Sequence, residues 1–141
     1  MSKSTGELFT ELKGDKNLAD WRERNSEEFV LPLNEYLAKL LAEKNLSKAE
    51  VIERAGLNRE YAYHIFAGVK KNPSRQKLLA LAIAMDLNLE EIQYLLRYAG
   101  LGILYPRNQW DAVIISAVEQ KLNVLETNEL LHRLGETTLL A

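Results

Sequence analysis

Residues 47–73 have the sequence SKAEVIERAGLNREYAYHIFAGVKKNP, which contains the clearest helix start and stop signals of the chain. Ser47 and Glu50 have the spacing of a capping box, in which the serine hydroxyl accepts a hydrogen bond from the Glu50 N–H and the glutamate reaches back to the Ser47 N–H. Gly56 can adopt the left-handed conformation that ends a helix. The sequence therefore predicts a short helix between Ser47 and Gly56.

A second short helix is predicted directly after the first. Asn58 is a favourable N-cap residue and Gly68 a favourable C-terminal stop, so residues 59–67 are expected to be helical. Because only Gly56, Leu57 and Asn58 separate the two helices, the turn that joins them is tight. Two short helices joined in this way have the layout of a helix-turn-helix.

The segments on both sides of this stretch also have helical periodicity. Strand signals are almost absent, since neither a sustained apolar–polar alternation nor an Asn-Gly or Asp-Gly turn occurs. The chain is therefore predicted to be all-α. The helices expected outside the central pair are 4–13, 17–28, a helix from about Pro32 to Asn45, 75–85, 89–99, 109–120 and 124–134.

These helices divide the chain into three segments. Residues 33–100 hold five helices and form the predicted helix-turn-helix domain, residues 1–32 form a polar helical extension, and residues 101–141 form a two-helix C-terminal extension. Helix 109–120 contains Ala112-Val113-Ile114-Ile115 and is apolar almost all round, so it is either buried or covers a partner. We expect this helix to supply the surface of a homodimer.

The composition argues against several classes of protein. With 47% apolar and 27% charged residues the chain can bury a core, and it has no apolar run near the roughly 18–20 residues that a membrane span needs. It has no apolar segment of a secretory signal and no cysteine, which fits a cytoplasmic protein.

His64 and His132 are too far apart in sequence to indicate a metal site. Since no phosphate loop or catalytic motif occurs, neither an enzyme nor a cofactor is expected.

Charge is concentrated locally, although the net charge is only −2. Between residues 54 and 77 there are six basic residues and a single acidic one, Glu60. The net charge argues against a protein that coats nucleic acid by bulk charge alone. The local cluster indicates either a face for an anionic partner or a solvated surface whose charge is unevenly spread.

Residues 47–73 resemble the helix-turn-helix of the lambda-repressor-like (XRE) family of bacterial and phage transcriptional regulators. The resemblance rests on the turn residue Gly56, the pair Ala62 and Ile65, the closing Gly68, and the basic loop that leads to Pro73. It implies a lambda-repressor-like five-helix fold over about 33–100. It also implies a sequence-specific regulator, in most cases a repressor, that binds double-stranded DNA as a homodimer.

The sequence departs from the family pattern within the motif. Ile52 stands where the family has an alanine at the crossing of the two helices, which implies a wider crossing. Ala67 stands where the family often has an asparagine that contacts phosphate, and alanine cannot make that hydrogen bond. Lys48 replaces the glutamine that opens the family motif, and it can contact phosphate through its charge.

In such a domain the helix 59–67 would lie in the major groove, with its N-terminal side chains at the base edges. Arg59 is the strongest candidate for a base contact, because a bidentate arginine–guanine contact is worth about 1–3 kcal/mol of discrimination. The inward face is predicted to be Ala62, Ile65, Phe66 and Val69. The residues predicted to contact bases are Asn58, Arg59, Glu60, Tyr63 and His64, and those predicted to contact phosphates are Lys48, Lys70, Lys71 and Arg75.

A second hypothesis uses the same fold to bind a protein. Glu60, Ala67 and the aromatic pair Tyr61 and Tyr63 would give a less polar outer face, which suits a protein partner better than DNA. The chain would then be an adaptor or an antitoxin-like protein with weak DNA binding or none. Tyr61 and Tyr63 can also be explained as packing residues.

Overall fold

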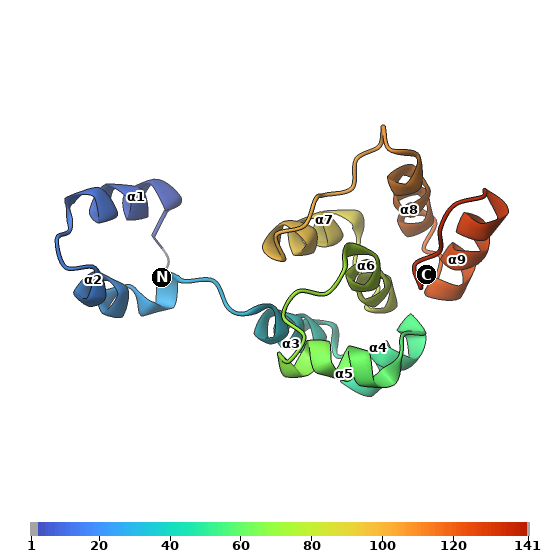
Figure 1. Ribbon diagram of the computed structural model, residues 1–141, viewed down its shortest axis with the longest axis horizontal. Helices are drawn as coiled ribbons and strands as arrows, with labels where there is room; N and C mark the ends of the chain where they lie inside the picture. The colour runs from blue at the N-terminus through green and yellow to red at the C-terminus, as the bar shows by residue number, and fades with distance from the viewer. Residues whose placement is uncertain (1–2, 141) are drawn as a thin grey trace. The chain divides into compact units, whose positions relative to one another are not determined.

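The computed structural model describes residues 3–140, and this part of the chain contains helices and no β-strand (Figure 1). The predicted all-α class is therefore confirmed. The elements are α1(Thr5–Gly14), α2(Leu18–Arg24), the 3-10 turn η1(Ser26–Glu28), α3(Leu33–Lys44), α4(Lys48–Ala55), α5(Arg59–Ala67), α6(Arg75–Ala84), α7(Leu89–Tyr98), α8(Gln109–Glu119) and α9(Val124–Arg133).

The chain divides into two compact units, Met1–Leu31 and Pro32–Ala141. In the first unit Trp21 is 3% exposed, and its ring packs edge-on against Phe29 with the ring centres 5.9 Å apart. The single helix predicted over 17–28 is wrong. Helix α2 ends at Arg24, because the backbone of Asn25 leaves the helical conformation (φ −110°, ψ 25°) and its side-chain amide donates back to the carbonyl of Trp21.

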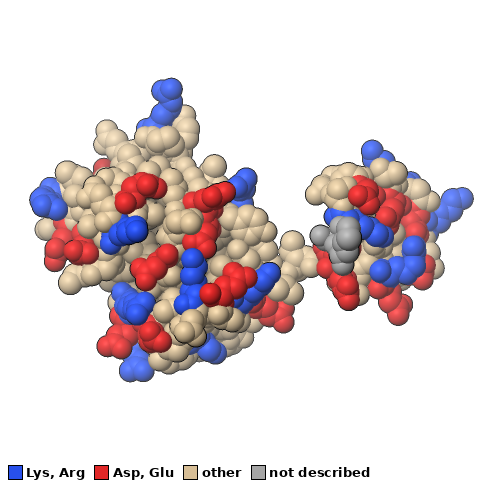
Figure 2. All heavy atoms as spheres, turned by 180° about the vertical axis from the view of Figure 1, so that it is seen from behind, with Lys and Arg blue, Asp and Glu red and all other residues tan. Residues whose placement is uncertain are grey.

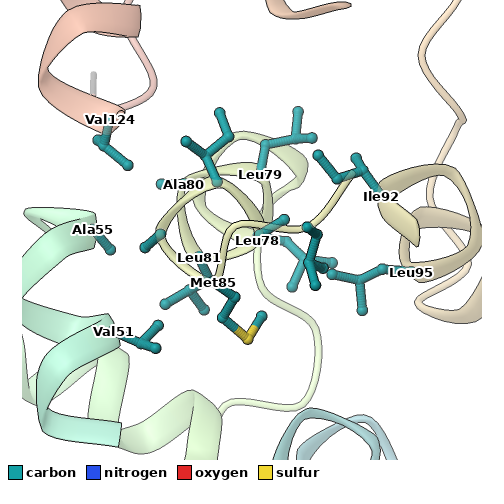
Figure 3. Close-up of a cluster of buried hydrophobic side chains, with 14 of the residues drawn as sticks. Val51, Ala55, Leu78, Leu79, Ala80, Leu81, Met85, Ile92, Leu95 and Val124 are labelled. Carbon is teal, nitrogen blue, oxygen red and sulfur yellow. The ribbon is translucent and has the colours of Figure 1, made fainter. Parts of the chain in front are cut away.

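Helix α6 lies at the centre of the second unit (Figure 3). Side chains from three other helices point toward it, among them Val51 of α4, Ile92 of α7 and Val124 of α9. The sequence predicted a single buried face on this helix, but every residue from Leu78 to Ala84 is buried. The prediction was incomplete because α9 packs on a second side of α6.

The C-terminal extension shares the core of the helix-turn-helix. Ile114, Val124, Leu131 and Leu139 are all buried in the same hydrophobic cluster as the residues of α4 to α7. Helix α8 packs against α7 and α9, and its residues Ile114 and Ala117 are buried whereas its other apolar side chains are half-buried. Much of its apolar character is therefore explained by packing within the chain, and its use as a homodimer surface stays a prediction.

The predicted helix ends around the central turn are confirmed. Ser47 Oγ accepts from the Glu50 N–H at 3.1 Å, and the glutamate side chain accepts from the Ser47 N–H. Asn58 Oδ1 accepts from the Tyr61 N–H at 3.0 Å and begins α5. Gly56 and Gly68 have φ values of +69° and +81°, the left-handed conformation that ends α4 and α5.

Candidate nucleic-acid interface

Helices α4 and α5 pack directly on each other, and the turn that joins them buries one of its three residues. Leu57 in that turn and Ile52 in α4 are both buried in the core. The predicted inward face of α5 is confirmed for Ala62, Ile65 and Phe66. It is wrong for Val69, which is 69% exposed, because the left-handed turn at Gly68 redirects the chain before that residue.

The five residues predicted to contact bases lie on the outer face of α5 or at its cap, and all are exposed. They are Asn58, Arg59, Glu60, Tyr63 and His64. Arg59, in the first turn, has no ion pair within residues 3–140, so its guanidinium is available to a ligand. Asn58 differs from the others, since its side-chain oxygen is already bound to the Tyr61 N–H.

Three of the predicted phosphate contacts are exposed lysines next to this face. Lys48 is the first residue of α4, and Lys70 and Lys71 follow α5 in the loop to α6. The two loop lysines line a groove of about 480 Å³ between that loop and the start of α3. The chain runs close to α3 here, because a Cβ atom on Gly68 would lie 3.0 Å from the side chain of Asn34.

A fourth lysine, Lys77, joins this group through Tyr61. The ammonium groups of Lys70 and Lys77 each lie 5.6 Å from the centre of the Tyr61 ring, within the range of a cation–π interaction. Tyr61 is half-buried on α5, and Lys77 is in the first turn of α6. The loop and the start of α6 are thus linked to α5 by one aromatic ring.

Arg75, the fourth predicted phosphate contact, is engaged within the protein. Its guanidinium binds the carboxylate of Asp111 through two hydrogen bonds of 2.8 and 2.9 Å, and donates to the carbonyls of Gly102 and Ile103. Asp111 is buried and also accepts from the Tyr105 N–H. In the structure Arg75 thus holds the α7–α8 loop, and its predicted contact with a phosphate would compete with these hydrogen bonds.

Acidic and basic side chains are interspersed on the face of the molecule that Figure 2 shows. This agrees with the small net charge and means that the field over this face has no single sign. An anionic ligand would therefore depend on a local group of cations, such as the one around α5.

Residues 37–92 match a protein-family model described as Helix-turn-helix. The resemblance of the central motif to the lambda-repressor-like (XRE) helix-turn-helix is therefore confirmed over this part of the chain. The match runs from α3 to the first turn of α7 and includes α4, α5 and their joining turn. No curated protein and no solved structure matches the chain.

The helix-turn-helix domain is a DNA-binding regulatory domain, and domains of this family are not typically enzymatic. Within residues 3–140 no group of histidine and acidic side chains could hold a metal ion. Nor does this part of the chain contain a helix long and apolar enough to span a membrane.

Neither Tyr61 nor Lys77 was among the residues predicted to contact bases or phosphates. Lys77 was counted in the basic cluster between residues 54 and 77, but nothing in the local sequence places it beside Tyr61. Acidic side chains are favourable in the first turn of a helix, and the first turn of α6 has none. This feature of the sequence could have indicated that Lys77 faces an anionic ligand.

Proposed function

We propose that the protein is a sequence-specific transcriptional regulator, a repressor, that binds double-stranded DNA as a homodimer with α5 in the major groove. The observation that carries this proposal is the exposed outer face of α5, with Arg59 in its first turn, inside a domain of a DNA-binding family. Lys48 and the lysines of the α5–α6 loop lie beside that face and supply the positive charge that a DNA backbone requires.

The two groups of side chains have different tasks in this proposal. The lysines bind phosphates and fix the orientation of the domain, whereas Arg59 and its neighbours select the sequence. A helix as short as α5 contacts few base pairs. Symmetric half-sites about 34 Å apart, each bound by one protomer, would give the specificity that one domain lacks. A dimer bound in this way represses by excluding other proteins from the duplex.

Selection from a pool of random duplex DNA, at low and at near-physiological salt, tests the proposal. Enrichment of a palindrome with two half-sites is the expected result, and sedimentation of the protein–DNA complex should give two protomers per duplex. A folded protein that enriches no sequence at either salt concentration would overturn the proposal.

Two substitutions separate base contacts from phosphate contacts. Arg59→Ala should remove the preference at one or two base pairs, a loss of about 1–3 kcal/mol of discrimination. Lys71→Ala should weaken binding to all sequences alike and reduce the salt slope by about one. Titrations of the selected duplex and of a random duplex over a range of salt measure both effects. Arg133→Ala, on the exposed surface of α9, is the control. If both substitutions behave like this control, the proposed docking of α5 is wrong.

The exposed apolar side chains beside α5 favour a second candidate function. Tyr63 is 39% exposed and Val69 69% exposed, and Ala67 between them offers no hydrogen bond to phosphate. Such a surface suits an adaptor that binds a protein through α5. In that case Tyr63→Ala would abolish binding of the partner, and the selection from random DNA would give no enriched sequence.

A further inference from the structure

Tyr61 and the two lysines beside it form an arrangement that the proposed function does not yet use. They come from three different parts of the second unit: Tyr61 from α5, Lys70 from the following loop and Lys77 from the first turn of α6. Both ammonium groups lie 5.6 Å from the centre of the same ring. One aromatic side chain therefore restrains two positive charges.

The two lysines have no compensating charge in the described structure. Neither of them forms an ion pair within residues 3–140. The first turn of α6 contains Arg75 and Lys77 but no acidic residue, although the positive end of a helix dipole disfavours cations. Arg75 is neutralised by Asp111, whereas Lys77 is not. A bound anion would relieve the repulsion that remains.

We propose that Tyr61 is a positioning residue that holds Lys70 and Lys77 as a two-lysine clamp on the DNA backbone. This inference rests on the proposed function and extends it, because it adds Lys77 as a phosphate contact and assigns Tyr61 a role in binding. The clamp directly follows the recognition helix. When α5 enters the major groove, the segment after it meets the backbone that borders the groove.

The ring contributes to binding by limiting the freedom of the lysine side chains before DNA arrives. A free lysine loses much rotamer entropy when it is fixed on a phosphate, and a lysine already held over a ring loses less. Cation–π attraction depends on the face of the ring and not on the phenol hydroxyl. Phenylalanine should therefore replace Tyr61 without loss, whereas leucine should not.

The test uses the full chain and fluorescence anisotropy, with the selected duplex and a random duplex titrated over a range of salt. Lys77→Gln should weaken binding to both duplexes and lower the magnitude of the log–log salt slope by about 0.9, the value for one phosphate contact. Lys77→Arg should restore the slope. Lys121→Gln, which removes an exposed lysine from the α8–α9 turn, is the matched control and should behave like the wild type.

The positioning role of Tyr61 is tested in the wild-type chain and in a chain without the two lysines. In the wild-type chain Tyr61→Leu should weaken binding to both duplexes, and Tyr61→Phe should not. In a chain that carries Lys70→Gln and Lys77→Gln, Tyr61→Leu should have no further effect on affinity, because a positioning residue acts only through the groups that it positions. Thermal unfolding followed by circular dichroism identifies any variant that loses its fold.

An unchanged salt slope in Lys77→Gln, with wild-type binding intact, would overturn the clamp and leave the proposed function standing. A Tyr61→Leu effect that persists without the two lysines would show a structural role for the ring and overturn its positioning role. A wild-type chain that binds neither duplex would overturn the proposed function and the clamp together.

Discussion

At the scale of single residues, the buried carboxylate of Asp111 fixes the loop between α7 and α8 to the start of α6. It accepts two hydrogen bonds from Arg75 and one from the Tyr105 N–H, and the same guanidinium binds the carbonyls of Gly102 and Ile103. Burial by itself would raise the pKa of Asp111. The hydrogen bonds from Arg75 and Tyr105, with the positive charge of Arg75, outweigh burial and lower that pKa below its ordinary value.

A lowered pKa in the folded state makes stability depend on pH in a defined direction. In the unfolded chain the Asp111 carboxylate takes up a proton near about pH 3.9, and in the folded chain it does so only at lower pH. The contribution of Asp111 to the free energy of unfolding is therefore complete above about pH 3.9, and it is lost as the pH falls through the pKa of the folded state. Asp111→Asn leaves Arg75 unpaired and should lower the free energy of unfolding by about 3 kcal/mol at pH 7.

Urea unfolding of the wild type and Asp111→Asn between pH 7 and pH 3 measures this difference, which should shrink toward the acid end. Glu129→Gln removes an exposed carboxylate from α9 and is the control, with an expected change within about 0.5 kcal/mol. A difference between wild type and Asp111→Asn that stays constant down to pH 3 would contradict the assigned role of the carboxylate.

From the sequence one could predict a residue's cap function, exposure or burial where it depends only on spacing within a single helix. The cap at Asn58, the exposed position of Arg59 and the buried position of Ile65 all follow from spacing within α5. The pairing of Arg75 with Asp111 could not be predicted, because these residues are 36 positions apart and meet only through the packing of α8. For the same reason Arg75 was predicted to contact phosphate.

At the scale of elements, α6 is the helix on which the second unit is built. Every residue from Leu78 to Ala84 is buried, and α4, α7 and α9 all pack against it. The stretch 78–85 contains only apolar residues, so the sequence already held the signal for burial on all sides. Periodicity alone could not show which element covers the second side, because α9 lies far along the chain.

Because other helices pack around α6, its surroundings cannot easily collapse into the cavity that a truncated side chain would leave. Leu81→Ala in α6 should therefore lower the free energy of unfolding by roughly 2–5 kcal/mol. Leu125→Ala makes the same chemical change on α9 at a side chain that is 67% exposed, and should cost much less. Urea unfolding of the two variants beside the wild type gives both values. Equal, small losses would mean that α6 is not enclosed as described.

At the scale of the whole molecule, the helix-turn-helix and the C-terminal extension depend on one core. The extension supplies buried side chains from α8, from α9 and from the segment after α9. That last segment also brings Leu140 close to the turn between α4 and α5. The predicted segments 33–100 and 101–141 are therefore parts of one compact unit. This continuity couples the stability of α5 to residues that do not themselves belong to the helix-turn-helix motif.

Removal of residues 101–141 should therefore abolish cooperative unfolding. The deletion takes away Leu104, Ile114, Val124, Leu131 and Leu139, all buried. Each contributes roughly 1.5–3 kcal/mol by burial, and a domain has a total stability of only about 5–15 kcal/mol. A chain that lacks residues 1–31 keeps the whole second unit and is the matched control, expected to unfold in one cooperative transition. Thermal unfolding followed by circular dichroism separates the two. A chain of residues 1–100 that melts cooperatively near the full-length temperature would show that the helix-turn-helix does not need the extension as part of its core.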